Sequence, residues 1–401
     1  MKTVLISGAG IAGPTLAYWL RAAGYEPTLV ERAPALRRGG YVIDFWGLGY
    51  DIAERMGLLP AIESAGYRVR EMRIVDDRGR RVAGFGTDVL DDLTGGRYVT
   101  LARSDLSRLL YGSVRDGVET IFDEEIVALE PQPEWVDVRL RRGGRRRFDL
   151  VVGADGLHSQ VRRLAFGPIG TFERHLGYGV AAFETRFYRR RDENVYLMHN
   201  RPGRMIGRFA LRDDRTLFLF VFRGDAGGPA AQQKAQLREL YRDAGWECPD
   251  ILNELERADD LYCDRVSQIR MDGWSRGRVV LIGDAAFCVS LVARQGSALA
   301  MISAYVLAGE LARADGRYDQ AFAAYEARLR DYIGAKQRGA ERFAAAFAPR
   351  PPWGLWFRNQ VIRMFALPGA ARLAVGRDLA DRLDLPDYRW VGTQALRAEV
   401  N

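Results

Sequence analysis

The chain has 401 residues, of which 48% are hydrophobic and 28% are charged. A disordered chain is poorer in apolar residues, so this composition excludes global disorder, and the length favours two domains or one large composite domain. The net charge of +7 comes mainly from arginines spread along the whole chain. Because these residues do not gather in one arm or helix, we expect no nucleic-acid partner.

The three cysteines, Cys248, Cys263 and Cys288, include no CxxC pair. Their odd number fits a reducing cytoplasm better than a disulfide framework, and with only three histidines the sequence predicts no metal site. The N-terminal apolar run, residues 3–7, is too short for a signal peptide, and the longest such run, residues 298–309, is too short to span a membrane. We therefore expect a soluble cytoplasmic protein.

The first predicted elements are a strand at residues 4–6, a helix at 11–23 and a second strand at 27–30. The turn before the helix consists of Gly8, Ala9, Gly10, Ile11, Ala12 and Gly13. Gly8 permits the tight turn, Gly10 lets the backbone approach a pyrophosphate, and Gly13 lets helix and strand pack closely. Glu31 ends the second strand, where a carboxylate accepts hydrogen bonds from ribose hydroxyls. This unit predicts dinucleotide binding at the helix N-terminus.

The middle of the chain has the pattern of short antiparallel strands. Residues 67–103 alternate between polar and apolar positions, and the arginine-rich segment around Gly143-Gly144 predicts a hairpin turn. Aromatic-rich runs between 177 and 223 flank Asp213-Asp214, which predicts a hairpin at the centre of a sheet. We expect these aromatic strands, from Tyr178 to Phe222, to form the roof of a substrate pocket.

Two further strands are predicted to be buried. Residues 148–152 lead into Gly153-Ala154-Asp155-Gly156, and residues 278–282 lead into Gly283-Asp284 and a helical region to about 347. Glu31 and Asp284 both follow strands, so they can serve one long cofactor if those strands lie side by side in one sheet, at the carboxyl ends where open α/β sheets bind ligands.

For several other residues the sequence suggests a structural role, a functional role, or both as alternatives. Trp353, Phe357, Val361 and Phe365 recur every four residues, a stripe expected to pack between the domains, with membrane contact or a substrate lid as alternatives. His158 is expected to support its motif structurally. His199, on a predicted loop, is either structural or a substrate-side acid or base. Cys288 is expected to be inert packing.

Three separated segments together resemble the class A FAD-dependent monooxygenases, which include p-hydroxybenzoate hydroxylase and the tetracycline-inactivating and polyketide-tailoring enzymes. The first is the glycine turn with Glu31 and Arg32. The second is residues 153–162, similar to the family's GADGxxSxVR segment, and the third is residues 278–286, ending in Gly-Asp-Ala-Ala. The resemblance covers most of the chain.

The resemblance implies roles for particular residues. Glu31 and Arg32 would bind the ADP half of FAD, Asp155 would hold the structure near the pyrophosphate, and Asp284 would bind the ribityl chain. Arg162 would lie near FAD or the nicotinamide cofactor. The cofactor-binding residues implied in this way, together with the glycine turn, are Gly8, Gly10, Ile11, Ala12, Gly13, Glu31, Arg32, Arg37, Arg103, Asp155, Asp284, Gly296 and Ser297. The helix that begins near Gly296 and Ser297 would stabilise negative charge on a reduced flavin.

The implied fold is α/β, with a Rossmann-like (GR2-type) FAD-binding domain, an inserted mixed or antiparallel β-sheet substrate domain, and C-terminal helices. Residues 1–70, 100–170 and 275–347 would form the discontinuous FAD domain. Residues 71–99 and 171–274 would form the substrate domain, followed by a C-terminal helical segment at 348–401.

The resemblance implies an NAD(P)H-consuming monooxygenase. The enzyme would be a monomer or homodimer and would act in secondary metabolism, such as antibiotic biosynthesis. NADPH or NADH would reduce FAD, O2 would form a flavin C4a-hydroperoxide, and an aromatic or polyketide-like small molecule would receive one oxygen atom without a dedicated catalytic side chain. Residues 287–296 depart from the family, because the usual prolines are missing and Arg294 replaces a glycine. Arg294 would pair with the flavin or a substrate carboxylate, obstruct oxygen chemistry, or point to solvent. This departure leaves a non-redox, FAD-binding cyclase as the alternative.

Overall fold

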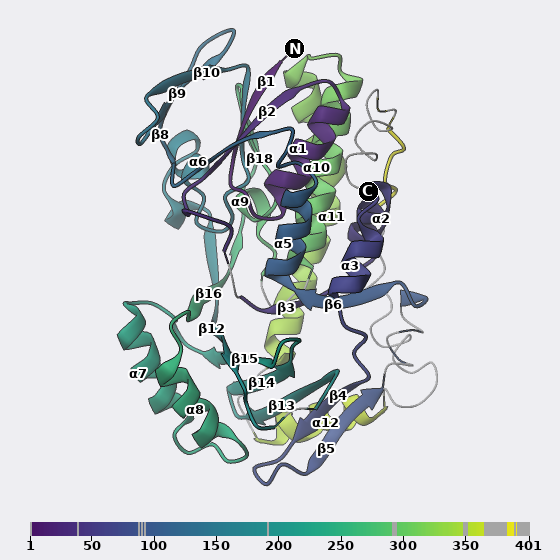
Figure 1. Ribbon diagram of the computed structural model, residues 1–401, viewed down its shortest axis with the longest axis vertical. Coiled ribbons are helices and arrows are strands. Elements are labelled where there is room, and N and C mark those ends of the chain that lie inside the picture. Colours follow the sequence, from purple (N-terminus) through teal and green to yellow (C-terminus); the bar gives the residue numbers. More distant parts are fainter. Residues whose placement is uncertain are drawn as a thin grey trace.

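The computed structural model describes most of the chain. The described residues are 2–37, 40–86, 89, 91, 94–190, 192–290, 295–347, 352–364, 383–388 and 390. Two sheets lie at opposite ends of the elongated molecule, and the long strands β12 (Glu173–Arg186) and β16 (Tyr262–Ile269) run between them (Figure 1).

The first sheet has six strands and is mainly parallel. Its strands in spatial order are β17 (Ser275–Arg276), β18 (Val279–Leu281), β11 (Leu150–Gly153), β1 (Thr3–Ser7), β2 (Glu26–Glu31) and β7 (Glu119–Phe122). Every neighbouring pair is parallel except β17 and β18. Parallel strands covered on both faces are apolar throughout, as in Val4, Leu5 and Ile6, which are fully buried. The strands predicted at 4–6, 27–30, 148–152 and 278–282 are confirmed.

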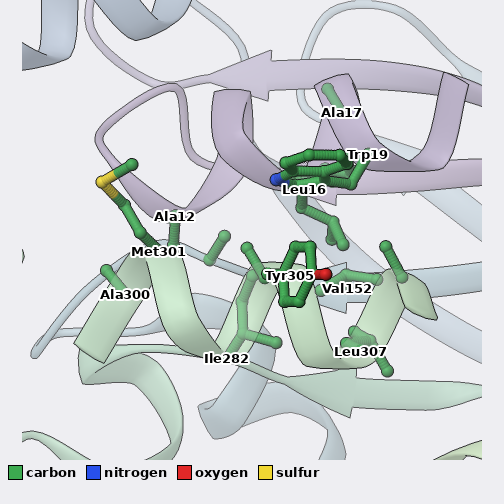
Figure 2. Close-up of a cluster of buried hydrophobic side chains, with 14 of the residues drawn as sticks. Ala12, Leu16, Ala17, Trp19, Val152, Ile282, Ala300, Met301, Tyr305 and Leu307 are labelled. Carbon is green, nitrogen blue, oxygen red and sulfur yellow. The ribbon is translucent and has the colours of Figure 1, made fainter. Parts of the chain in front are cut away.

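Helix α1 (Ala12–Ala22) packs on α10 (Gly296–Arg313) beside this sheet. Figure 2 shows Leu16 and Trp19 from α1 against Tyr305 from α10, and Ala12 beside Met301. The rings of Trp19 and Tyr305 meet edge to face, with centroids 5.0 Å apart. α11 (Tyr318–Phe347) then packs on α10. This packing places the N-termini of α1 and α10 near the carboxyl ends of the strands.

Smaller elements complete this end of the molecule. The helices are α2 (Leu48–Arg55), α3 (Leu59–Ala65), α5 (Arg103–Gly112), α6 (Gln160–Ala165), α9 (Asp284–Phe287) and the 3-10 turn η1 (Ile169–Thr171). The strands are β3 (Val42–Trp46), β6 (Tyr98–Ala102), β8 (Ile126–Pro131), β9 (Val136–Leu140) and β10 (Arg145–Phe148). β3 pairs with β6, and β9 and β10 form an antiparallel hairpin. The hairpin predicted around Gly143-Gly144 is thus confirmed.

The second sheet has seven strands. In spatial order they are β16, β12, β15 (Arg215–Arg223), β14 (Arg204–Ala210), β13 (Val195–Arg201), β4 (Glu71–Val75) and β5 (Arg81–Gly86). All neighbours are antiparallel except β13 and β4. β14 and β15 are joined at Asp213 and Asp214, whose φ angles of 57° and 54° suit a two-residue hairpin turn. The predicted central hairpin is confirmed.

The aromatic strands do not form a roof over a pocket in the way the sequence suggested. Phe183, Phe218 and Phe220 point to the outer face of the second sheet, where they pack against α7 (Ala230–Tyr241) and α8 (Cys248–Arg257). Because strand side chains alternate between faces, the inner face instead receives the residues between them, such as Leu217 and Leu219. The expectation is therefore wrong for these three phenylalanines, whereas Phe209 and Tyr196 of the same sheet do lie on the inner face.

Helix α12 (Pro352–Met364) lies against β5 and β13. Trp353 is 72% exposed and Phe357 is 60% exposed, so the expected burial of this stripe is wrong for both residues; Phe365 lies outside the described residues. Ile362, from another side of the helix, packs on the second sheet. Residues 383–388 are not helical, and Tyr388 returns to α10, where its hydroxyl donates to Glu310 over 2.6 Å. Across the described helices, none combines the length and apolar composition needed to cross a bilayer.

Candidate functional site

Three loops leave the first sheet at the same edge. The last residues of β1, β11 and β18 are in register, with Ser7 paired to Gly153 and Gly153 paired to Leu281. Each strand is followed by one of the three sequence motifs. The structure therefore brings together segments that lie up to 270 residues apart. Glu31 ends β2 and Asp284 follows β18 in the same sheet, although β1 and β11 separate these two strands.

The glycine turn after β1 is shaped by close backbone contacts. Gly8 has a φ of 108°, and a Cβ atom there would lie 2.5 Å from the Ala154 oxygen. A Cβ on Gly13 would lie 1.9 Å from the Gly8 oxygen, whereas one on Gly10 would meet no atom within 4 Å. Packing therefore requires glycine at two positions, and Gly10 faces open space. No side chain caps the N-terminus of α1, at Ile11 and Ala12, so its N–H groups are available to an anion.

Glu31 is tied to the glycine turn. Its carboxylate accepts hydrogen bonds from the backbone N–H groups of Ala9, over 2.9 Å, and Ala33, over 3.0 Å. The carboxylate is thus held at the end of β2, beside the turn, with lone pairs left for a further donor. Arg32 and Arg37 lie nearby in sequence with exposed side chains. The family resemblance also implies that Gly39-Gly40, with Arg37 or Arg38, forms a loop that passes the flavin edge; Arg38 and Gly39 lie outside the described residues.

Asp155 binds the N-terminus of α6. It accepts hydrogen bonds from the N–H groups of Gln160, over 2.8 Å, and Val161, over 3.1 Å, and from the hydroxyl of Ser159. Burial raises the pKa of Asp155, and these hydrogen bonds oppose that shift. The Ser7 hydroxyl also donates to it over 3.4 Å, so Asp155 joins the first two motifs. This arrangement agrees with a structural role close to the turn.

Arg162 joins the second and third motifs. It is 1% exposed, and its guanidinium donates to the backbone oxygens of Ala285, over 2.8 Å, and Leu157, over 2.5 Å. A buried guanidinium bonded to two carbonyls braces the backbone. The family resemblance implies a place for Arg162 near FAD or the nicotinamide cofactor, and its hydrogen bonds join the loops around that site.

Asp284 begins α9 at the point where the third motif meets the other two. A Cβ on Gly283 would lie 3.4 Å from the Cβ of Ala12 and 3.5 Å from that of Ala300. A Cβ on Gly296 would lie 3.8 Å from Asp284 Oδ1, so this carboxylate is next to the first turn of α10. Burial raises the pKa of Asp284, and the charge of Arg103 opposes the shift.

The N-terminus of α10 is a second helix end at this edge. It begins with Gly296 and Ser297, and no side chain caps it. The first N–H groups of an 18-residue helix thus lie beside a buried carboxylate and remain available to hydrogen-bond acceptors. The preceding residues 291–294, with Arg294 among them, lie outside the described residues, so the structure does not test the expectations for Arg294.

Two tyrosines that sequence reasoning missed lie at this site. Arg103, the first residue of α5, donates its backbone N–H to the backbone oxygen of Tyr41 over 3.1 Å. The rings of Tyr41 and Tyr262 are 5.9 Å apart. Burial raises the pKa of Tyr41 to about 12, with smaller effects from Arg103 and Asp284. The only signal for Tyr41 was its place after Gly39-Gly40; Tyr262 had none.

Tyr41 and Tyr262 belong to a hydrophobic cluster that reaches the inner face of the second sheet. The cluster contains the buried residues Tyr67, Val69, Ala182, Phe209, Leu211 and Leu217, with Tyr41, Val42, Tyr196, Leu219 and Tyr262 partly buried around them. One carboxylate borders this cluster, since Asp44 accepts hydrogen bonds from Thr100 Oγ1, over 2.7 Å, and Tyr196 Oη, over 3.3 Å. The arrangement provides an aromatic and apolar wall next to the three motifs.

His158 lies between the two sheets. It belongs to the second motif, and its Nε2 is 3.1 Å from each carboxylate oxygen of Asp264 on β16. That carboxylate raises the pKa of His158. His158 therefore links the motif loop to the second sheet, in agreement with the expected structural role.

His199 does not lie on the inner side. It is in β13 rather than on a loop, is 2% exposed, and its ring stacks against Trp246 beside α8. Its Nε2 is 2.8 Å from Asp77, and its Nδ1 is 3.8 Å from the Cys248 sulfur. Met198, the residue before it, lies on the opposite, inner face. The alternative that made His199 a substrate-side acid or base is therefore wrong.

His199 should instead make stability depend on pH. Burial lowers the pKa of His199 below its ordinary value near 6.5, so the unfolded chain takes up this proton at higher pH than the folded chain. The stabilisation is complete above about pH 6.5 and is lost as the pH falls toward the lowered value. Urea unfolding between pH 7.5 and 5 should show this loss, and it should shrink in His199→Gln. If the unfolding free energy depended on pH equally in both proteins, His199 would not be the group responsible.

The described cysteines are all free, and burial raises the pKa of Cys288 well above its ordinary value. A thiol with a raised pKa is a poor nucleophile, in agreement with packing. Within the described ranges, no group of His, Cys, Asp or Glu side chains is arranged to hold a metal ion.

The site fits a long dinucleotide. Gly10 leaves open space at the uncapped N-terminus of α1, Glu31 lies at the end of β2, and Asp284 lies at the uncapped N-terminus of α10. The N-terminus of α1 suits a pyrophosphate, Glu31 suits a ribose, and Asp284 suits a hydroxylated chain. Arg103, Tyr41 and Tyr262 lie next to the last of them.

Comparisons with known proteins agree with this fit. Residues 1–334 match the family model described as an FAD binding domain. A flavin-dependent monooxygenase of Legionella longbeachae is 33% identical over 96% of this chain and 98% of that protein. An uncharacterised protein of Mycobacterium tuberculosis is 40% identical over 84% of this chain and 92% of that protein. The chain therefore belongs to the FAD-binding-domain family, among the class A flavoprotein monooxygenases.

Solved structures support the same fold. The tetracycline destructase Tet(55) has a TM-score of 0.82 with 30% identity, covering 97% of this chain and 99% of that one. Klebsiella pneumoniae HpxO, complexed with FAD and uric acid, has a TM-score of 0.74 with 23% identity, covering 90% and 92%, and shows the fold alone. The protein is thus an α/β flavoprotein monooxygenase, an oxidoreductase with a Rossmann-like FAD-binding domain.

Proposed function

We propose that the protein uses NADPH or NADH and O2 to insert one oxygen atom into an aromatic or polyketide-like small molecule. The observation that carries the proposal is the convergence of three motif loops and the α10 N-terminus beside an aromatic wall. FAD bound there supplies the chemistry, because reduced flavin activates O2 for oxygen transfer.

The residues of the chain would bind, orient and exclude water. The N–H groups at Ile11 and Ala12 would bind the pyrophosphate, and Glu31 would bind a ribose. Asp284 would accept from the ribityl hydroxyls, and Gly296 and Ser297 would present their N–H groups to the electron-rich side of the ring. Arg103 would balance the charge of Asp284.

Tyr41, Tyr196 and Tyr262 would form the side of the chamber that a flat, hydrophobic substrate contacts. They are partly buried members of a cluster whose remaining residues are apolar, and such a wall keeps water from the reacting atoms. The proposed reaction needs no side chain as a nucleophile, and positioning would do most of the catalytic work.

We further propose that residues 1–70, 100–170 and 275–347 form the FAD-binding domain, and that 71–99 and 171–274 form the substrate domain. The division is supported by the two sheets, which draw their strands from these two sets of segments. A cytoplasmic location is supported by the three free cysteines. We propose a monomer or homodimer that needs no partner for the reaction.

Purified protein tests the activity. Saturated with FAD, it should be yellow, and NADPH or NADH should bleach it anaerobically in the presence of aromatic and polyketide test compounds. Air should then restore the colour with uptake of O2 and a product heavier by one oxygen atom. A protein that takes up no FAD would contradict the proposal. A yellow protein that neither coenzyme bleaches with any tested compound would favour the non-redox cyclase.

A further inference from the structure

Two buried glutamines bond to the backbone just beyond Asp284. Gln268 in β16 is fully buried, and Gln337 in α11 is 5% exposed. Gln268 Nε2 donates to the oxygens of Val289, over 2.9 Å, and Gln337, over 2.8 Å. The two side chains thus connect β16, α11 and the segment after α9, three elements far apart in sequence.

The side chain of Gln337 also bonds to this segment and to the end of β16. Its Nε2 lies 2.8 Å from the Ile269 oxygen, 3.3 Å from that of Phe287 and 3.4 Å from that of Cys288. α9 is a single turn, so its last carbonyls have no partner within the helix. The amide groups supply donors that this short helix lacks. We call Gln268 and Gln337 the glutamine clamp.

The orientation of the Gln268 amide is set by a charged neighbour. Arg270 donates to Gln268 Oε1 from Nε, over 3.1 Å, and from Nη2, over 2.8 Å. An arginine can only donate, so the amide oxygen must face Arg270 and the NH2 group must face the carbonyls. Arg270 Nη2 also lies 2.8 Å from Glu341, another residue of α11. Arg270 therefore fixes the orientation of the Gln268 amide.

The clamped segment ends in an unusual backbone conformation. Ser290 is 4% exposed and has a φ of 130°, a value that residues with side chains rarely adopt. Such a conformation persists only when its surroundings impose it. Val289, directly before it, is one of the residues that the clamp holds. Asp284 lies at the other end of the segment, next to the first turn of α10.

We propose that Gln268 and Gln337 are positioning residues, which hold residues 287–290 so that Asp284 and the N-terminus of α10 meet the flavin in a reactive geometry. The inference rests on the proposed function, since it requires FAD at this site. The clamp does not touch the cofactor and acts through the backbone. Its loss should therefore change how bound flavin reacts more than whether FAD binds.

Replacement by methionine tests the clamp, because methionine keeps the length of glutamine but has no N–H donor. In Gln337→Met and Gln268→Met, saturated with FAD, we expect an altered visible flavin spectrum. The rate constant of anaerobic flavin reduction by NADPH or NADH should fall about 10- to 100-fold, as displacements near 1 Å do in active sites. The matched control is Gln233→Met, which removes an exposed amide that donates to the Gly228 oxygen and should react like the wild type.

Ser290→Gly provides an independent check. If the clamp works by imposing the strained conformation, glycine should accept that conformation freely, and Gln337→Met combined with Ser290→Gly should recover part of the lost rate. If a methionine variant does not fold, Gln337→Glu serves, because it keeps the shape and replaces a donor with an acceptor.

Variants that lose thermal stability yet keep the wild-type spectrum, reduction rate and coenzyme KM would overturn the inference, because the clamp would then only stabilise the fold. Failure of the proposed function would look different. In that case the wild type and Gln233→Met would themselves take up no FAD or show no reduction.

Discussion

In a Gly13→Ala variant, the free energy of unfolding should be lower than that of the wild type by about 3 kcal/mol or more. The added Cβ would lie 1.9 Å from the Gly8 oxygen, well inside the contact distance of two heavy atoms. Alanine normally favours a helix interior by about 1 kcal/mol over glycine, but this overlap must move either the turn or α1. Urea unfolding of the FAD-free protein measures the change.

Gly10→Ala is the matched control for this result. A Cβ at this position meets no atom within 4 Å, so the FAD-free variant should unfold within about 0.5 kcal/mol of the wild type. Its affinity for FAD should fall, because the methyl group would occupy the space reserved for the pyrophosphate. Equal unfolding of both variants, or normal FAD affinity in Gly10→Ala, would contradict the arrangement of this turn.

Asp284→Ala should bind FAD about 10- to 100-fold more weakly, and the purified variant should be largely colourless. The change removes a hydrogen-bond acceptor for the ribityl chain and leaves the nearby Arg103 charge without its counterpart. A hydrogen bond to a charged group contributes about 1.5–3 kcal/mol, which corresponds to this range. Titration of the FAD-free protein with FAD, followed by flavin fluorescence, measures the affinity.

Two comparisons make the Asp284 result specific. Asp259→Ala changes an exposed carboxylate in the turn after α8 and should retain wild-type affinity. The unfolding free energy of FAD-free Asp284→Ala should stay near that of the wild type or rise, because burial already disfavours the charged form of this residue. Normal flavin content in Asp284→Ala would remove Asp284 from the cofactor site.

Much of the first sheet was predictable because its signals are local. The apolar runs of β1, β11 and β18 are nearly continuous, as parallel strands covered on both faces must be. Glycine positions were predictable for a similar reason. At Gly8 the backbone angle itself demands glycine, and the residues that impose it are near in sequence or in the next motif.

The face on which a strand side chain lies was less predictable. Phe218 and Leu217 are neighbours in one apolar run, yet they pack in different clusters on opposite sides of the sheet. When helices or another sheet cover both faces, both sets of residues are apolar and the pattern does not distinguish them. His199 was misjudged for a different reason: the sequence predicted a loop where the structure has β13, and the side chain lies beside α8.

The features least predictable from the sequence are Tyr41, Tyr262 and the glutamine clamp. Tyr41 and Tyr262 are more than 220 residues apart, and Gln268 and Gln337 belong to a strand and a helix with no motif of their own. Their contacts arise when β16, α9 and α11 meet, which is a result of long-range packing. No periodicity or spacing within one segment carries that information.

The length and motifs of this chain by themselves determined a dinucleotide-binding α/β fold assembled from separated segments. They did so because tight turns require glycine and strands buried on both faces require apolar runs, and both are visible within a short stretch of sequence. Only the tertiary structure decided which face of the second sheet borders the site, that Arg162 braces two loops, and that two buried amides hold the segment beyond Asp284. These features depend on contacts between distant residues, and such contacts exist only once the chain has folded.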